Sequence, residues 1–150
     1  MRVQRSAPAV PLGFVIDSSS TRLLHAPTVL SMSESTAYRL TLAIRIVAGV
    51  IFVVFGAGKF VNHAGEAESF AGYGLPLPGL TVVLIGIVEL AGGALLLAGR
   101  LVRPAAAVLA ANMTVAFLVA GVGHGEVIPS LTLAPALLAA MLFLVFLERR

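Results

Sequence analysis

Four long segments with almost no charge dominate the sequence. They run from about residue 40 to 60, 79 to 99, 104 to 123 and 130 to 147, and each holds 18–21 residues. As helices they would be about 27–32 Å long, which matches the hydrocarbon core of a bilayer. Transmembrane β-strands would be about ten residues long with strict alternation of apolar and polar positions, and that alternation is absent. The segments therefore predict an all-α, polytopic membrane protein built as a bundle of four transmembrane helices.

Composition supports this class and excludes others. Charged residues make up 11% of the chain, against about 25% in soluble domains. The chain has no cysteine, which excludes disulfides, thiol redox pairs and thiolate metal ligands. Scattered arginines do not predict nucleic-acid binding, and the separate His63 and His124 do not predict a metal site. No cofactor motif is evident, so a redox role would need a borrowed cofactor or a partner.

Residues 1–38 differ from the rest of the chain. They hold three prolines and a run of serine and threonine, so we expect a largely disordered extension before a membrane domain at 39–150. Met32 begins a stretch that resembles a natural protein start. Residues 1–31 therefore have two interpretations, a genuine extension or an addition that the native protein lacks, and N-terminal sequencing distinguishes them.

Charge asymmetry predicts the orientation. Three groups of arginines share one side of the membrane if the helices alternate in direction: Arg22, Arg39, Arg100, Arg103, Arg149 and Arg150. The positive-inside rule then places both termini in the cytoplasm. The loop 61–78 on the other side is rich in apolar and aromatic residues, and we expect it to lie on the membrane surface or to fold over the bundle.

Glu89 lies in the middle of the second apolar segment. A carboxylate at that depth costs about 2.5–3.5 kcal/mol or more, so it marks either a ligand or proton site or a buried structural partner. Both interpretations stay open.

Small residues share helix faces with the polar ones. Arg45, Gly49, Gly56 and Lys59 fall on one face of the first helix. Gly86, Glu89 and Gly93 share a face of the second, and Asn112 lies among small residues of the third. Such glycine faces allow helices to approach closely. We therefore predict that Gly49, Gly56, Gly86 and Gly93 pack helices together and turn the polar residues inward.

Depth along the helices suggests which polar residues meet. Glu89 and Asn112 are predicted at about the same level, and Arg45 is the favoured third member of a buried polar cluster. Lys59, near the other end of the first helix, is the alternative to Arg45 as the cation of this cluster. Each has a simpler alternative: Arg45 and Lys59 can extend to the membrane interface, and Asn112 can serve only as an interhelical hydrogen-bonding group.

Several motifs carry a family resemblance. Arg45-Ile-Val-Ala-Gly49 and Phe55-Gly-Ala-Gly-Lys59-Phe60 are followed by Gly86-Ile-Val-Glu-Leu-Ala-Gly-Gly93 and Arg103-Pro104. From Arg45 to about Ala120 the pattern resembles the DoxX-like family of small four-helix membrane proteins. The resemblance implies an inner-membrane oxidoreductase component. Relatives include a subunit of a thiosulfate:quinone oxidoreductase and a membrane partner of superoxide dismutase and a sulfurtransferase.

Three functions are compatible with these features. The first is a non-catalytic membrane subunit or anchor of a redox or detoxification complex, with a soluble oxidoreductase or sulfur-handling enzyme as partner. The second is a protein that binds quinone or a small anion, in which Arg45 or Lys59 binds the ligand and Glu89 exchanges a proton. The third is a small-solute carrier, which would require a homo-oligomer because four helices leave little room for a pathway.

Overall fold

The computed structural model describes residues 34–147, and every regular element in that part is helical. The elements follow in the order α1 (Glu34–Val61), α2 (His63–Gly72), α3 (Pro78–Ala98), α4 (Val102–Ala116), η2 (Phe117–Gly123), η3 (Val127–Leu131) and α5 (Leu133–Leu147). Four stretches are long and apolar enough to cross a membrane: Ser35–Val61, Pro78–Ala98, Val102–Gly123 and Val127–Phe146. The prediction of an all-α, multi-pass membrane protein is confirmed.

Helix α1 is longer than the sequence predicted. Its 28 residues contain no proline and would measure about 42 Å, more than the hydrocarbon core needs. Residues 34–38 are helical, so the expected disordered extension is wrong for that part. The remainder of the extension, the two interpretations of residues 1–31, and the terminal arginines lie outside the described residues.

Helix α3 begins with a proline and ends at a glycine, two residues that are typical of helix termini. Pro78 occupies its first turn, where the missing N–H costs nothing. At the other end Gly99 takes a left-handed conformation with φ 67°, and the Arg100 N–H donates to the Leu95 carbonyl at 3.0 Å. This arrangement satisfies carbonyls that the helix end would leave unpaired.

The last membrane stretch starts irregularly. Helix α4 continues into the π-helical segment η2, and a short loop leads to η3, in which Ile128 is extended (φ −124°, ψ 127°). Pro129 lies within η3, and a proline N has no hydrogen to donate to a helical carbonyl. Regular helix α5 therefore begins at Leu133, later than the predicted residue 130.

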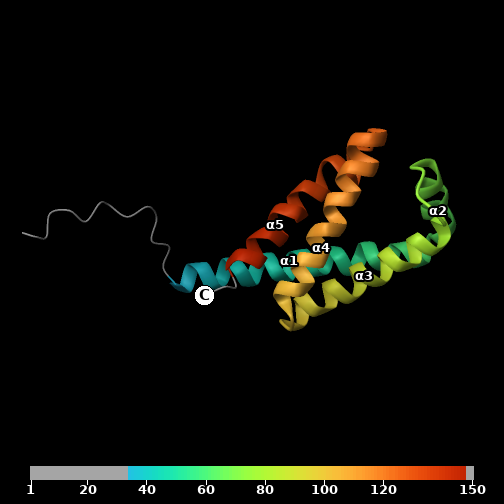
Figure 1. Ribbon diagram of the computed structural model, residues 1–150. Helices are drawn as coiled ribbons and strands as arrows, with labels where there is room; N and C mark the ends of the chain where they lie inside the picture. The colour runs from blue at the N-terminus through green and yellow to red at the C-terminus, as the bar shows by residue number, and fades with distance from the viewer. Residues whose placement is uncertain (1–33, 148–150) are drawn as a thin grey trace, which may run out of the picture. The chain divides into compact units, whose positions relative to one another are not determined.

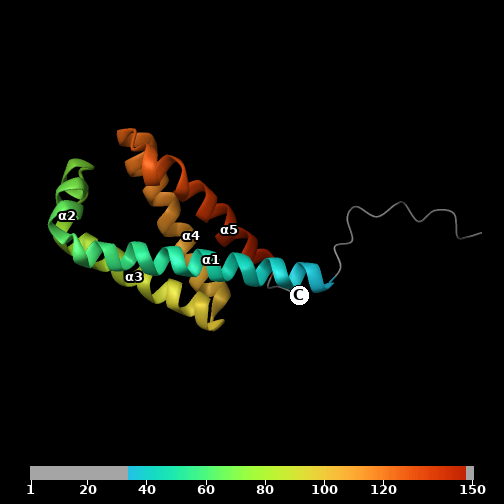
Figure 2. The ribbon, with the colours of Figure 1, turned by 180° about the vertical axis from the view of Figure 1, so that it is seen from behind.

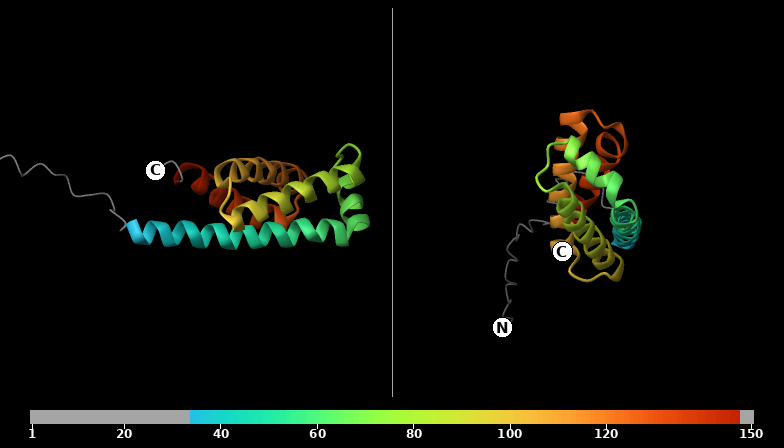
Figure 3. Two further views of the ribbon diagram at one scale, coloured as in Figure 1. Left: turned by 90° about the horizontal axis from the view of Figure 1, so that it is seen from below. Right: turned by 90° about the vertical axis from the view of Figure 1, so that its right-hand side faces the viewer.

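The helices associate in two pairs. Helix α1 packs along α3, and α4 packs along α5 (Figure 1, and from behind in Figure 2). Helix α2 turns across the end of this arrangement and packs on α3 (Figure 3), where a ring nitrogen of His63 lies 3.0 Å from the Gly79 carbonyl oxygen. The 61–78 segment thus folds over one end of the bundle, which was one of its two expected placements.

Glycines bring the α1 and α3 backbones into contact. A Cβ added to Gly93 would lie 2.8 Å from the Gly49 carbonyl oxygen, and one added to Gly56 would lie 2.8 Å from the Leu90 nitrogen and 3.0 Å from the Gly86 carbonyl oxygen. Real Cβ atoms do not approach backbone so closely, and neither backbone can move without separating the helices. The structure places the four predicted packing glycines at this contact.

The apolar core lies among α1, α3, α4 and α5. Leu109 of α4 is fully buried and fits against Gly92 of α3, where an added Cβ would lie 2.8 Å from Leu109 Cγ. The largest fully buried side chains are Phe52, Leu96, Leu109, Met141, Leu144 and Val82. This core holds α4 against α3 and so fixes the level of Asn112 relative to Glu89.

Candidate functional site

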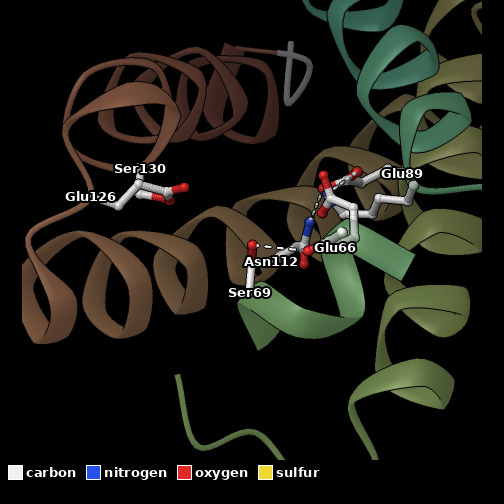
Figure 4. Close-up of polar contacts among 8 residues, drawn as sticks. Glu66, Ser69, Glu89, Asn112, Glu126 and Ser130 are labelled. Atoms are coloured by element: carbon white, nitrogen blue, oxygen red, sulfur yellow. Dashed lines mark hydrogen bonds and ion pairs between the residues drawn. The ribbon is translucent and has the colours of Figure 1, made fainter. Parts of the chain in front are cut away.

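Four helices each contribute one side chain to a polar cluster around the buried Glu89. Glu89 of α3 is 3% exposed, and its Oε1 accepts a hydrogen bond from Asn112 Nδ2 of α4 at 2.9 Å. Its Oε2 lies 3.5 Å from Lys59 Nζ of α1. That same Nζ lies 3.5 Å from Glu66 Oε2 of α2. We call these four residues the Glu89 cluster, and Figure 4 labels three of them, Glu66, Glu89 and Asn112.

Glycine packing explains how Lys59 reaches Glu89. Gly86 lies almost one turn before Glu89 on the same face of α3, and a Cβ there would lie 3.3 Å from Lys59 Cβ. The absence of a side chain at Gly86 lets the stem of Lys59 cross α3. Only 11% of the Lys59 side chain is exposed, so Lys59 points into the protein toward Glu89 and Glu66 and does not extend away from the helices.

Arg45 does not join the cluster, so its predicted place beside Glu89 is wrong. Its guanidinium lies at the other end of α3, where a Cβ added to Gly99 would be 3.0 Å from Nη1. Arg45 precedes Lys59 by about 21 Å along α1. Helical side chains lean toward the N-terminus of their own helix, which carries Arg45 away from the bundle centre and Lys59 toward it. A cation beside the α3 C-terminus is also favoured by the helix dipole.

One oxygen of Glu89 lacks a hydrogen-bond donor. Oε2 is buried and has no hydrogen-bond partner among the described residues, and its ion-pair contact with Lys59, at 3.5 Å, exceeds the ~2.7–2.9 Å of a charge-assisted hydrogen bond. Buried acceptors are nearly always paired with protein or water. Glu89 therefore offers an open acceptor inside the protein.

The Glu89 cluster lines a cavity of about 200 Å³. Its walls are largely apolar and include the aromatic side chains of Phe52, Phe55 and Phe70. For comparison, a cavity of about 150 Å³ holds benzene. The volume fits a small ring system rather than the drug-sized ligands of larger pockets, which need about 300 Å³ or more.

A second polar group lies on the wall of the same cavity. Ser130 donates a hydrogen bond to the Glu126 carboxylate, and Glu126 lies close enough to Tyr73 to raise the pKa of its phenol. All three residues line the cavity, and Figure 4 shows Glu126 and Ser130 apart from the Glu89 cluster. We call them the Glu126 group. Each polar group combines a carboxylate acceptor with a donor.

Helix α2 and the turn after it cover this cavity through aromatic contacts. The Tyr73 ring lies 5.0 Å from the His124 ring and 6.3 Å from the Phe70 ring, measured between centroids. Lys59 Nζ lies 5.9 Å from the Phe70 centroid, within reach of a cation–π interaction. Helix α2 and the turn after it therefore contribute to both polar groups, because Phe70 lies beside Lys59 of the Glu89 cluster and Tyr73 belongs to the Glu126 group.

Sequence reasoning did not identify the Glu126 group or Glu66 as site residues. Glu66 had one usable signal, since it is a carboxylate in the loop that follows Lys59. Glu126 and Ser130 are four residues apart, which is a helical spacing, but the irregular η3 backbone that presents them has no such signal. No group of three or more metal-ligating side chains occurs within residues 34–147.

Tyr73 provides a pH-dependent test of the cover. Burial, and then the hydrogen bond and negative charge of Glu126, raise the pKa of Tyr73 above its usual value of 10.0. The folded protein therefore holds the phenol proton to higher pH than the unfolded chain. The resulting stabilisation is complete below about pH 10 and is lost as the pH rises through the folded-state pKa.

We expect Tyr73→Phe to reduce the alkaline loss of stability, measured as the free energy of unfolding on both sides of about pH 10. Tyr38 stays in both proteins, so the difference reports Tyr73. An equally steep alkaline loss in the variant would show that Tyr73 keeps no extra proton affinity in the folded state.

The sequence pattern of the DoxX family matches residues 40–122, more than half of the chain. This chain belongs to the DoxX family. The match covers α1 to η2 and therefore includes Lys59, Glu66, Glu89 and Asn112.

A curated relative extends the comparison. "Putative oxidoreductase CatD" of Bacillus subtilis (strain 168) is 36% identical over 63 residues, which are 42% of this chain and 46% of that protein. The chain thus matches about half the length of this relative. No solved structure matches the chain.

Proposed function

We propose that this DoxX protein is a membrane component of a redox system and that its cavity binds the ring of a quinone or quinol. The observation that supports this proposal most directly is a cavity of ring size with aromatic side chains in its walls. Glu89 Oε2, a buried acceptor without a hydrogen-bond donor, belongs to this site. The name of the Bacillus relative supports the redox setting.

The polar groups suit both redox forms of such a ligand. A quinone carbonyl accepts hydrogen bonds, and the ammonium of Lys59 and the hydroxyl of Tyr73 are donors. A quinol hydroxyl donates, and the carboxylates of Glu89 and Glu126 are acceptors. Two separate polar groups line the cavity, so each can serve one of the two oxygens that a para-quinone carries on opposite sides of its ring.

Reduction of a quinone adds two electrons and two protons. The carboxylates at the two polar groups exchange the protons in this proposal, and a soluble oxidoreductase partner exchanges the electrons. The chain thus binds and positions the ligand as a subunit or anchor. Affinity capture from native membranes should recover such an oxidoreductase, and repeated recovery of the chain alone would contradict the partner.

The proposal includes an orientation. Arg39, Arg100 and Arg103 lie at the end of the bundle opposite α2, and the positive-inside rule assigns that end to the cytoplasm of a bacterial inner membrane. The α2 cover then faces outward. Cysteine substitutions at Glu68 and Arg103, labelled with an impermeant thiol reagent on intact cells, test this: we expect labelling at residue 68 only.

Glu89→Gln tests the ligand site. The variant keeps the size of the side chain but replaces the carboxylate acceptor, so we expect about ten- to 100-fold weaker quinol binding, as for loss of a hydrogen bond to a charged group. Binding of a short-chain quinol to the purified protein in nanodiscs is measured by equilibrium titration. Glu68→Gln is the matched control, because Glu68 is exposed and does not line the cavity.

A further inference from the structure

A second hollow lies between α1 and α5. It has a volume of about 330 Å³, and every residue that lines it is apolar. Ala43 and Val47 of α1 face Ala136 and Ala140 of α5 across it. The small alanine side chains on both helices keep this groove open.

The groove and the polar cavity share a wall. Ile51, Leu133 and Leu137 line both. The same side chains therefore separate the ring-sized cavity from the groove at the α1–α5 face. Helix α1 packs mainly on α3 and makes fewer contacts with α5, so this is the looser seam of the bundle.

We propose that the cavity ligand carries an apolar isoprenoid chain, that this chain lies in the α1–α5 groove, and that the ligand reaches the cavity from the bilayer past Ile51, Leu133 and Leu137. The inference rests on the proposed quinone function. A ring held at the Glu89 cluster needs an exit for its chain, and the groove is a wholly apolar path that adjoins the cavity.

The groove supplies geometry rather than affinity. Lipid tails are as apolar as the groove walls, so the transfer of an isoprenoid chain from lipid to protein gains little from the hydrophobic effect. What the groove determines is whether a chain can leave the cavity while the ring stays bound. Blocking it should therefore weaken binding of the chain-bearing ligand and spare a ligand with no chain.

Ala136→Phe and Ala43→Phe, each made separately, block the groove from its two sides. In nanodiscs we expect either variant to bind a long-chain quinone about tenfold more weakly or worse, which corresponds to a steric cost of about 1.4 kcal/mol or more. Binding of the same quinone without a chain should stay within about twofold. The matched control is Ala139→Phe, on the same helix but outside the groove, with both ligands expected to bind as in the wild type.

The outcomes separate this inference from the proposed function. If the wild-type protein binds neither quinone, the proposed function is wrong and the inference falls with it. If both quinones bind and the groove variants leave long-chain binding unchanged, or weaken it no more than Ala139→Phe does, the cavity binds quinone but the chain takes another path. If a second copy of this chain or a bulk lipid occupies the groove instead, the variants change oligomer size or lipid retention without affecting the long-chain quinone, which also overturns the inference.

Discussion

Replacement of Lys59 by methionine is expected to destabilise the folded bundle by about 3–5 kcal/mol. The change removes the ammonium that lies 3.5 Å from both Glu89 and Glu66. Glu89 is almost completely buried, so its charge would lose its ion-pair partner in a medium of low dielectric constant. The free energy of unfolding in mixed micelles gives the measurement.

The double variant Lys59→Met/Glu89→Gln is the control for this effect. Glutamine keeps an oxygen that can accept the hydrogen bond from Asn112, and no charge remains without a partner at the centre of the cluster. Replacing both members of a buried ion pair is often close to neutral, so much of the lost stability should return. If the double variant is as unstable as Lys59→Met, the effect comes from packing and not from the buried charge.

Gly56→Leu is the second change with a large expected effect. The Cβ of a new side chain would lie 2.8 Å from the Leu90 nitrogen. The contact joins the backbones of α1 and α3, and neither backbone can rotate away from it. We expect α1 and α3 to separate locally at a cost of about 3 kcal/mol or more. Because Lys59 follows Gly56 by less than one turn, its contact with Glu89 should weaken too.

Gly58→Leu, two residues further along α1, is the matched control. A Cβ at Gly58 has no neighbour within 4 Å, and leucine is intrinsically a better helix former than glycine. We expect unchanged or slightly increased stability, measured by the same unfolding transition. Equal losses in the two variants would show that the α1–α3 contact does not depend on glycine.

The sequence predicted the contact between Glu89 and Asn112 because helix geometry alone places them at one level. The same geometry was not enough to choose between Arg45 and Lys59. That choice depends on the direction in which helical side chains lean and on the close approach of α1 to α3 at Gly86.

The Glu126 group could not be predicted for a different reason. Tyr73 reaches Glu126 only because α2 turns back over the end of the bundle, and Ser130 lies in the irregular η3 segment. Neither feature has hydrophobic periodicity, which is the signal that identifies membrane helices. Long-range contacts made by a short polar helix follow from tertiary packing and not from local pattern.

The central claim is that Glu89 is a ligand-binding carboxylate and not only a structural one. The titration of a short-chain quinol into the wild-type protein, Glu89→Gln and Glu68→Gln tests it most directly, with the free energy of unfolding measured on the same samples. We predict binding to the wild type and to Glu68→Gln, and at least about tenfold weaker binding to a folded Glu89→Gln. Equal affinity in the wild type and a folded Glu89→Gln would contradict the claim and leave Glu89 as a structural partner of Asn112 and Lys59.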